Sequence, residues 1–321
     1  MNKTVNRSQK TFLMIGLALV AQYILTGLVS CLIFAPFKDQ EALQSFVMTV
    51  GPGAVLAMTY IPRIVGAVAF WLMVRRIPVF ENKGDQLNLK ALIQLFVIMY
   101  AVSTVLNGVG TVISNISPAG GNRQLEEISS MVASGNIVGL MIPILLAPVF
   151  EELVFRKLIL DRTKGYGETT AIVFSALCFG LFHENLTQFL YAFCVGLFLG
   201  YIYCKTGKVL ITMVMHMAIN AFSSAIMFVL PLIGKESASA AVMGIMIVLA
   251  LMILIMIASG IILLIRWIRK KRFQPDNSMD TCIEKKSVFR TVYLNPGVAL
   301  YFVICTAIII TQLMNIQLFT V

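Results

Sequence analysis

Charged residues are scarce in this chain. Only 12% of its 321 residues are Asp, Glu, Lys or Arg, whereas 59% are hydrophobic. A soluble domain carries about 25% charged residues, so this composition excludes an ordinary soluble protein and indicates one that lies in lipid. The net charge of +10 comes from basic residues in short groups between apolar runs. That pattern is typical of membrane topology, and it gives no indication of nucleic-acid binding.

Cysteine pairs and a signal-peptide cleavage site are also missing. No two cysteines form a Cys-x-x-Cys motif, and most of them lie within or beside apolar runs, so we expect neither a disulfide framework nor a structural zinc site. The apolar run within Met1–Phe34 is long, and no small-x-small site follows it, which favours a retained membrane anchor. The six cysteines are Cys31, Cys178, Cys194, Cys204, Cys282 and Cys305.

Long apolar runs divide the chain. A helix needs about 20 predominantly apolar residues to cross a bilayer. We therefore predict an all-α fold, a polytopic membrane protein with about nine transmembrane helices. The runs that approach this length are 12–34, 54–74, 90–113, 137–160, 169–184, 187–204, 209–230, 239–266 and 297–319.

Basic residues gather at alternate ends of these runs. With a cytoplasmic amino terminus, every basic cluster falls on the cytoplasmic side, so the carboxyl terminus is expected outside. Residues 120–135 have apolar positions at helical spacing and are predicted to form an interfacial helix on the outer surface. Residues 273–295 are predicted to form a cytoplasmic loop. The basic clusters lie near 3–10, 75–83, 157–164, 205–208 and 266–272.

An acidic pair, Glu151 and Glu152, interrupts the apolar run 137–160. A charge at this depth costs at least ~2.5–3.5 kcal/mol, so the pair needs a physical reason. Glu152 and Arg156 are i and i+4, the spacing of an intrahelical ion pair. Glu151 then points about 100° away with no partner in its own helix. Pro143 and Pro148 weaken the helix ahead of the pair, which is typical of helices that line a cavity.

The chain has only two histidines, His183 and His216, and both lie in predicted membrane helices. Phe179 shares a helix face with His183, and Asn220 shares one with His216. Polar groups at this depth converge or line a wet cavity. Glu151 and His183 would then hold and deprotonate a water molecule, while His216 and Asn220 would stabilise an oxyanion. The competing interpretation is structural, with these residues tied together in a scaffold that only binds a partner.

For the two histidines to meet, their helices must differ in depth. The helical rise places His216 about 12 Å from Lys208, and His183 about 24 Å from Gly167. Helix 169–184 must therefore begin below the membrane surface or tilt strongly.

The sequence lacks the motifs of other intramembrane protease chemistries. A His-Glu-x-x-His zinc site would need a histidine where Thr187 stands, and no Gly-x-Ser-Gly or Gly-x-Gly-Asp motif occurs. Glu151, His183 and His216 could still form a three-ligand zinc site. We favour a site without metal or cofactor, because no second carboxylate is obviously free to orient the histidines.

Three short motifs follow one another along the chain: Glu151-Glu152-x-x-x-Arg156, Phe179-x-x-x-His183 and His216-x-x-x-Asn220. Together they resemble the signature of the CPBP superfamily, which comprises type II (Rce1-like) CAAX prenyl endopeptidases and bacterial Abi or bacteriocin-processing membrane proteins. The resemblance covers about residues 137–228.

The resemblance implies roles for the motif residues. Glu151 would activate water with help from His183, and His216 and Asn220 would form the oxyanion site. Glu152, Arg156 and Phe179 would support them. The chain would then consist of N-terminal helices with an outer interfacial segment (1–136), a catalytic helix core (137–230), and C-terminal helices with a cytoplasmic loop (231–321).

The expected function is therefore that of an intramembrane glutamate-type endopeptidase acting near the membrane on a membrane-associated or prenylated-type peptide. Its expected partners are this peptide or protein substrate and the lipid bilayer, with no nucleic acid, and its expected location is the plasma membrane of a bacterium. The alternatives are a non-enzymatic bacteriocin-immunity or partner-binding protein on the same scaffold, and a metal-dependent version of the protease. A proton- or ion-coupled transporter is less favoured, because the chain has no inverted repeat.

Overall fold

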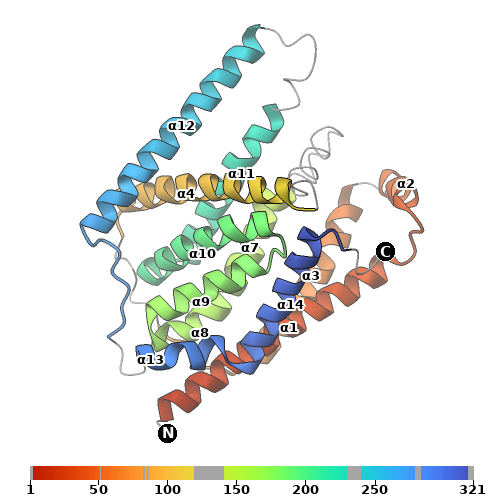
Figure 1. Ribbon diagram of the computed structural model, residues 1–321. Coiled ribbons are helices and arrows are strands. Elements are labelled where there is room, and N and C mark those ends of the chain that lie inside the picture. Colours follow the sequence, from red (N-terminus) through yellow and green to blue (C-terminus); the bar gives the residue numbers. More distant parts are fainter. Residues whose placement is uncertain are drawn as a thin grey trace.

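Helices make up the regular structure of the computed structural model (Figure 1). No strand occurs in the residues that it describes, so the predicted all-α class is confirmed. The helix predicted at 120–135 lies outside these residues. The structure describes 3–50, 52–81, 84, 87–118, 141–229, 240–278 and 283–316.

Within these ranges, six helices are long and apolar enough to cross a membrane. Each matches one of the predicted runs, and together they are the spans of an integral membrane protein. Two other apolar helices, α9 (Glu168–Leu181) and α11 (Val209–Val229), match two further runs. The full number of nine stays a prediction. The six long helices are α1 (Lys3–Phe34), α3 (Pro52–Val74), α4 (Leu89–Ile116), α10 (Leu186–Thr206), α12 (Ala240–Arg269) and α14 (Pro296–Leu313).

The run that carries the acidic pair is not one regular α-helix. The short helix α7 (Ala147–Glu152) lies between two π-helical stretches, η1 (Ile142–Leu146) and η2 (Leu153–Leu160). Pro143 falls in η1 and Pro148 in the first turn of α7, and proline has no amide hydrogen for the usual helical bond. The prolines therefore interrupt this helix, as expected, and π-helical turns are frequent at functional sites.

Short elements connect the long helices. They are α2 (Gln40–Val50), α8 (Asp161–Thr163), η3 (Lys164–Tyr166), α13 (Lys285–Val288) and η5 (Phe289–Tyr293).

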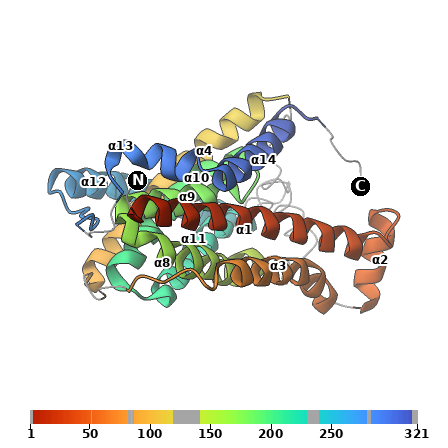
Figure 2. The ribbon, with the colours of Figure 1, turned by 90° about the horizontal axis from the view of Figure 1, so that it is seen from below.

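Two groups of helices enclose the central segment. α1 packs along α3 and α14, and α4 packs against α10 and α12. Figure 2 shows α1 and α3 side by side, and α9 contacts α10 between the two groups. α7 and η2 contact α11, so the acidic pair faces the helix that carries His216.

Glycines allow close crossings in both groups. A Cβ on Gly16 of α1 would meet the backbone of Gly297 and Val298 in α14, and a Cβ on Gly260 of α12 would meet Val97 and Ala101 of α4. Small residues of this kind are how membrane helices approach each other closely.

The basic clusters gather at one end of the molecule. The start of α1, α8 and the end of α12 lie toward the same end in Figure 1. Long-range hydrogen bonds join the helix ends there: Arg162 Nε donates to the Val74 carbonyl (2.9 Å), and the Tyr201 hydroxyl donates to the Arg272 carbonyl (3.1 Å). This arrangement agrees with the positive-inside pattern. Which side of the membrane this end faces stays a prediction.

Candidate functional site

Glu152 is completely buried and lies at the centre of a polar network. Its Oε2 is 2.9 Å from Arg156 Nε, and Arg156 Nη2 donates to its Oε1 (3.3 Å). Arg156 Nη1 also donates to Ser175 Oγ (3.3 Å), and that hydroxyl donates to the Phe155 carbonyl (2.9 Å). The intrahelical pair that the i, i+4 spacing predicts is therefore present. Burial of the two charges is tolerated here because they are paired and hydrogen-bonded.

His216 lies between the two glutamates. Its Nδ1 is 3.0 Å from Glu152 Oε1, and its Nε2 is 3.6 Å from Glu151 Oε2. Glu152 is ionised in its pair with Arg156 and only accepts, so Nδ1 of His216 must donate to it. The Nε2 atom is then the one available for chemistry, on the side of Glu151.

His183 is anchored in a similar way. Its Nδ1 is 2.9 Å from the Phe179 carbonyl, an acceptor, so Nδ1 donates and Nε2 is again left available. His183 lies close enough to Glu151 and His216 for their charges to act on its ring.

The Phe179 ring holds these groups together. It makes edge contacts with His183 (4.9 Å between centroids) and with His216 (5.6 Å). The guanidinium carbon of Arg156 lies 5.4 Å from the centre of the same ring. A single aromatic side chain thus contacts both imidazoles and the arginine of the ion pair, and helps to set where each imidazole lies.

The start of α9 is anchored inside the fold. Glu168, its first residue, is buried, and its carboxylate accepts from Lys205 Nζ (2.9 Å) and from the Asp276 amide (2.6 Å). The depth at which this helix begins in the membrane stays a prediction. His183 follows α9 in a short turn, where Glu184 has a positive φ of 55°.

Asn220 lies one helical turn beyond His216 on α11 and is half-buried. Glu151 is also only partly covered, with 16% of its side chain exposed, against none for Glu152. The structure thus brings Glu151, Glu152, Arg156, Phe179, His183 and His216 together, and it places Asn220 next to them along α11.

A family model described as type II CAAX prenyl endopeptidase Rce1-like matches residues 133–222, which contain all the motif residues. This segment is therefore similar to the Rce1-like family, and it is called the Rce1-like segment below. The match is consistent with the CPBP superfamily, and its family is one of CAAX-type intramembrane proteases. No curated protein and no solved structure matches the chain.

Residues outside the Rce1-like segment also reach the site, and sequence reasoning missed them. The Tyr60 ring of α3 lies 5.3 Å from the Phe150 ring, next to Glu151 in the chain. Arg63 follows one turn later on α3, and its guanidinium carbon lies 5.7 Å from the centre of the Tyr60 ring. The signal that could have found Arg63 was a charge inside a predicted span.

A metal site would require at least three of these side chains to be grouped as ligands. In the part of the chain that the structure describes, no three His, Cys, Asp or Glu side chains are grouped so that they could hold a metal ion. Glu152 nevertheless orients His216 through its Nδ1, an outer-shell arrangement that metal-binding histidines also use. The sequence argument that no second carboxylate orients the histidines is therefore wrong for His216.

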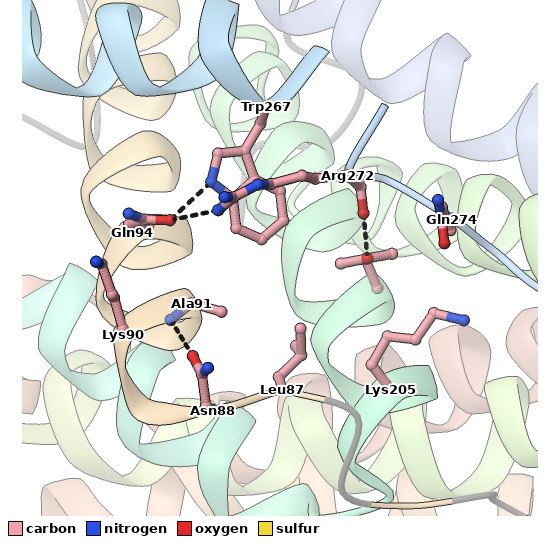
Figure 3. Close-up of a pocket in the computed structure, with 10 residues that line it drawn as sticks. Leu87, Asn88, Lys90, Ala91, Gln94, Lys205, Trp267, Arg272 and Gln274 are labelled. Carbon is pink, nitrogen blue, oxygen red and sulfur yellow. Dashed lines mark hydrogen bonds between the residues drawn. The ribbon is translucent and has the colours of Figure 1, made fainter. Parts of the chain in front are cut away.

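A separate cavity of about 430 Å³ lies at the basic end of the molecule (Figure 3). It is formed by the start of α4 and the ends of α10 and α12. Trp267 Nε1 (3.0 Å) and Arg272 Nη1 (3.3 Å) both donate to Gln94 Oε1 at its wall. None of its lining residues is a predicted site residue, so the cavity is not part of the Glu–His site.

Proposed function

We propose that this protein is an intramembrane endopeptidase that hydrolyses a peptide bond in a membrane-associated or prenylated peptide, using water activated by Glu151 and His183. The observation that carries the proposal is the His216 imidazole held between Glu151 and Glu152. A purely structural ion pair would need only Glu152 and Arg156. The additional, partly exposed carboxylate of Glu151 beside two anchored imidazoles supports chemistry.

The anchoring of the histidines suggests how the reaction proceeds. Water held by Glu151 and the free Nε2 of His183 attacks the peptide carbonyl carbon and gives up a proton to this pair. The tetrahedral intermediate then collapses, the C–N bond breaks, and the same proton passes to the leaving amine. The products are a carboxylic acid and an amine, with no covalent intermediate on the protein.

His216 and Asn220 are proposed to stabilise the oxyanion of the tetrahedral intermediate. The Asn220 amide can donate in any protonation state. Because Nδ1 of His216 already donates to Glu152, its Nε2 can donate only when the ring carries both protons. In this role His216 acts as an imidazolium, with its positive charge balanced by Glu151 and Glu152.

The alternative raised by the sequence is a metal-dependent version of the reaction, in which Glu151, His183 and His216 would hold the metal. The described residues do not group three such side chains for a metal ion, so the metal-free version is preferred. The two versions make opposite predictions for chelators and for Asn220, which are given in the Discussion.

The test is a peptidase assay on the purified protein in lipid nanodiscs. The substrates are membrane-tethered peptides, including prenylated Cys-a-a-X peptides. Wild-type protein should cleave at least one of them, and Glu151→Gln should not. Glu284→Gln is the matched control, because Glu284 is exposed and pairs with Lys286 away from the site. If no tethered peptide is cleaved, the non-enzymatic, partner-binding alternative is favoured, since a fold is better evidence of scaffold than of activity.

A further inference from the structure

α3 carries a positive charge in the middle of a membrane span. Arg63 is the single charged residue of the span Ala57–Val74. A charge at this depth is costly, so an arginine within a span is by default a functional residue that faces a partner, a cavity or the protein interior.

Arg63 lies on the face of α3 that is turned toward the protein. Positions 60, 63, 67, 70 and 74 fall on one face at helical spacing. Tyr60, Phe70 and Val74 on this face are buried, whereas Val65 and Leu72 of the opposite face are exposed. Arg63 is exposed although it is on the inward face. The Arg63 side chain is therefore exposed on a face of α3 that is otherwise largely buried.

The surroundings of Arg63 belong to the Glu–His site. Its guanidinium carbon lies 5.7 Å from the centre of the Tyr60 ring, which in turn packs on Phe150. Tyr60 thus joins Arg63 to Phe150, the residue that precedes Glu151 in the chain. Arg63 thus stands on the α3 side of the site, opposite the helices that carry the histidines.

Among the described residues, no carboxylate pairs with Arg63. Its one hydrogen bond in this part of the chain is a long one to the Thr59 carbonyl (3.5 Å). Arg156, by contrast, is buried against Glu152. An exposed guanidinium in a membrane span needs a counter-ion. Because Arg63 lies beside a proposed peptide site, the best candidate is an anionic group of the substrate itself.

We propose that Arg63 is a substrate-binding residue that pairs with a carboxylate of the peptide, either its carboxyl end or an Asp or Glu side chain. The inference rests on the proposed function and names a specificity determinant for it. A guanidinium binds a carboxylate through two parallel hydrogen bonds, which adds orientation to affinity. Bound in this way, the peptide would be held on the α3 side with its backbone directed toward Glu151.

The test measures binding rather than cleavage. Glu151→Gln protein in nanodiscs of zwitterionic lipid is titrated with two pairs of fluorescent prenylated peptides. One pair differs only in a free or amidated carboxyl end, and the other only in an internal Asp or Asn. Loss of the relevant carboxylate should weaken binding about 10- to 100-fold, as expected for a hydrogen bond between charged groups. The pair that shows this loss identifies the source of the carboxylate.

The double variant Glu151→Gln/Arg63→Gln should bind both members of that pair with equal, weak affinity. Glu151→Gln/Arg75→Gln is the matched control, because Arg75 lies over Trp71 at the end of the same helix (5.6 Å) and should keep the full discrimination. The inference is overturned if no peptide pair is discriminated, or if Arg63→Gln weakens both members equally. Discrimination that depends on Arg63, without cleavage by wild-type protein, would instead refute the proposed hydrolysis and leave the binding role in place.

Discussion

Glu151 and Glu152 are neighbours in the chain, yet their side chains meet different surroundings. Glu152 is buried against Arg156 and His216, whereas Glu151 is partly exposed and faces Nε2 of the same histidine. The Glu152 carboxylate therefore stabilises the fold through its charge pairs, and the Glu151 carboxylate is available to a substrate or to water.

Substitutions at the two glutamates should separate these roles. Glu151→Gln should abolish peptidase activity while the unfolding temperature stays close to that of the wild type. Glu152→Gln and Arg156→Ala should each lower the free energy of unfolding by roughly 3–5 kcal/mol, because each leaves a buried charge without its partner. Thermal unfolding and turnover of the purified variants check this, and an equal loss of stability in Glu151→Gln and Glu152→Gln would contradict it.

The oxyanion role is tested by Asn220→Ala together with metal chelation. Asn220→Ala should lower turnover about 10²–10³-fold with little change in substrate affinity, because the charge that it stabilises develops only in the transition state. His216→Ala should act in the same way, although it also removes a partner of Glu152. Chelators should leave turnover intact.

The metal-dependent version makes the opposite prediction. Stoichiometric zinc in the purified protein, lost together with activity on chelation and regained on adding metal, would refute the metal-free reaction. Asn220→Ala would then matter little, since an asparagine amide is a poor zinc ligand.

At the scale of elements, a second buried charge cluster joins α8 to the end of α10. Asp161 accepts hydrogen bonds from Lys164 Nζ (2.7 Å) and from the Tyr203 hydroxyl (3.0 Å). Burial lowers the pKa of Lys164, and the hydrogen bond to Asp161 opposes this shift. The Asp161 carboxylate therefore keeps the buried Lys164 charged directly after the end of η2, the helical stretch that follows the acidic pair.

Asp161→Asn should destabilise the protein by roughly 3–5 kcal/mol, because Lys164 then stays buried without its counter-ion. Adding Lys164→Met should recover much of this loss, since an apolar side chain of similar length replaces the unpaired charge. Chemical unfolding of the single and double variants measures both effects. A double variant no more stable than Asp161→Asn would show that Lys164 is not the cause.

The crossing of α12 and α4 depends on Gly260. A Cβ at this position would meet Val97 and Ala101, so Gly260→Ala should lower stability by about 1–3 kcal/mol, the usual cost of overpacking. Gly244→Ala on the same helix is the control, because a Cβ there meets nothing within 4 Å. Equal unfolding temperatures for the two variants would argue against the close crossing.

At the scale of the whole molecule, the basic ends of the helices lie together, and the positive-inside rule assigns this end to the cytoplasm. Cysteines introduced into 75–89, 205–208 and 267–295 should therefore be labelled only from the cytoplasmic side, and those in 114–136 only from outside. The experiment compares permeant with impermeant thiol reagents on intact cells, in a background without exposed cysteines. Labelling of 114–136 from the cytoplasmic side would show that the number of spans ahead of Glu151 differs from the predicted one.

Local patterns predicted much of the fold. Apolar runs located the six long helices, because the length and hydropathy of a span are properties of consecutive residues. They did not predict the π-helical stretches around α7, although Pro143 and Pro148 indicated that this helix is interrupted. The i, i+4 spacing predicted the pairing of Glu152 with Arg156, since helical geometry alone sets that distance.

The amino-acid sequence by itself thus determined the helical class, the apolar spans and the contacts made within one helix. Only the tertiary structure decided that His216, from a helix 64 residues further along the chain, enters between Glu151 and Glu152. It also placed Arg63 of α3 over the Tyr60 ring, which packs on Phe150 beside the same site. The physical reason is that contacts between helices depend on how the helices cross and at what depth they start, and no periodicity within a single helix specifies either.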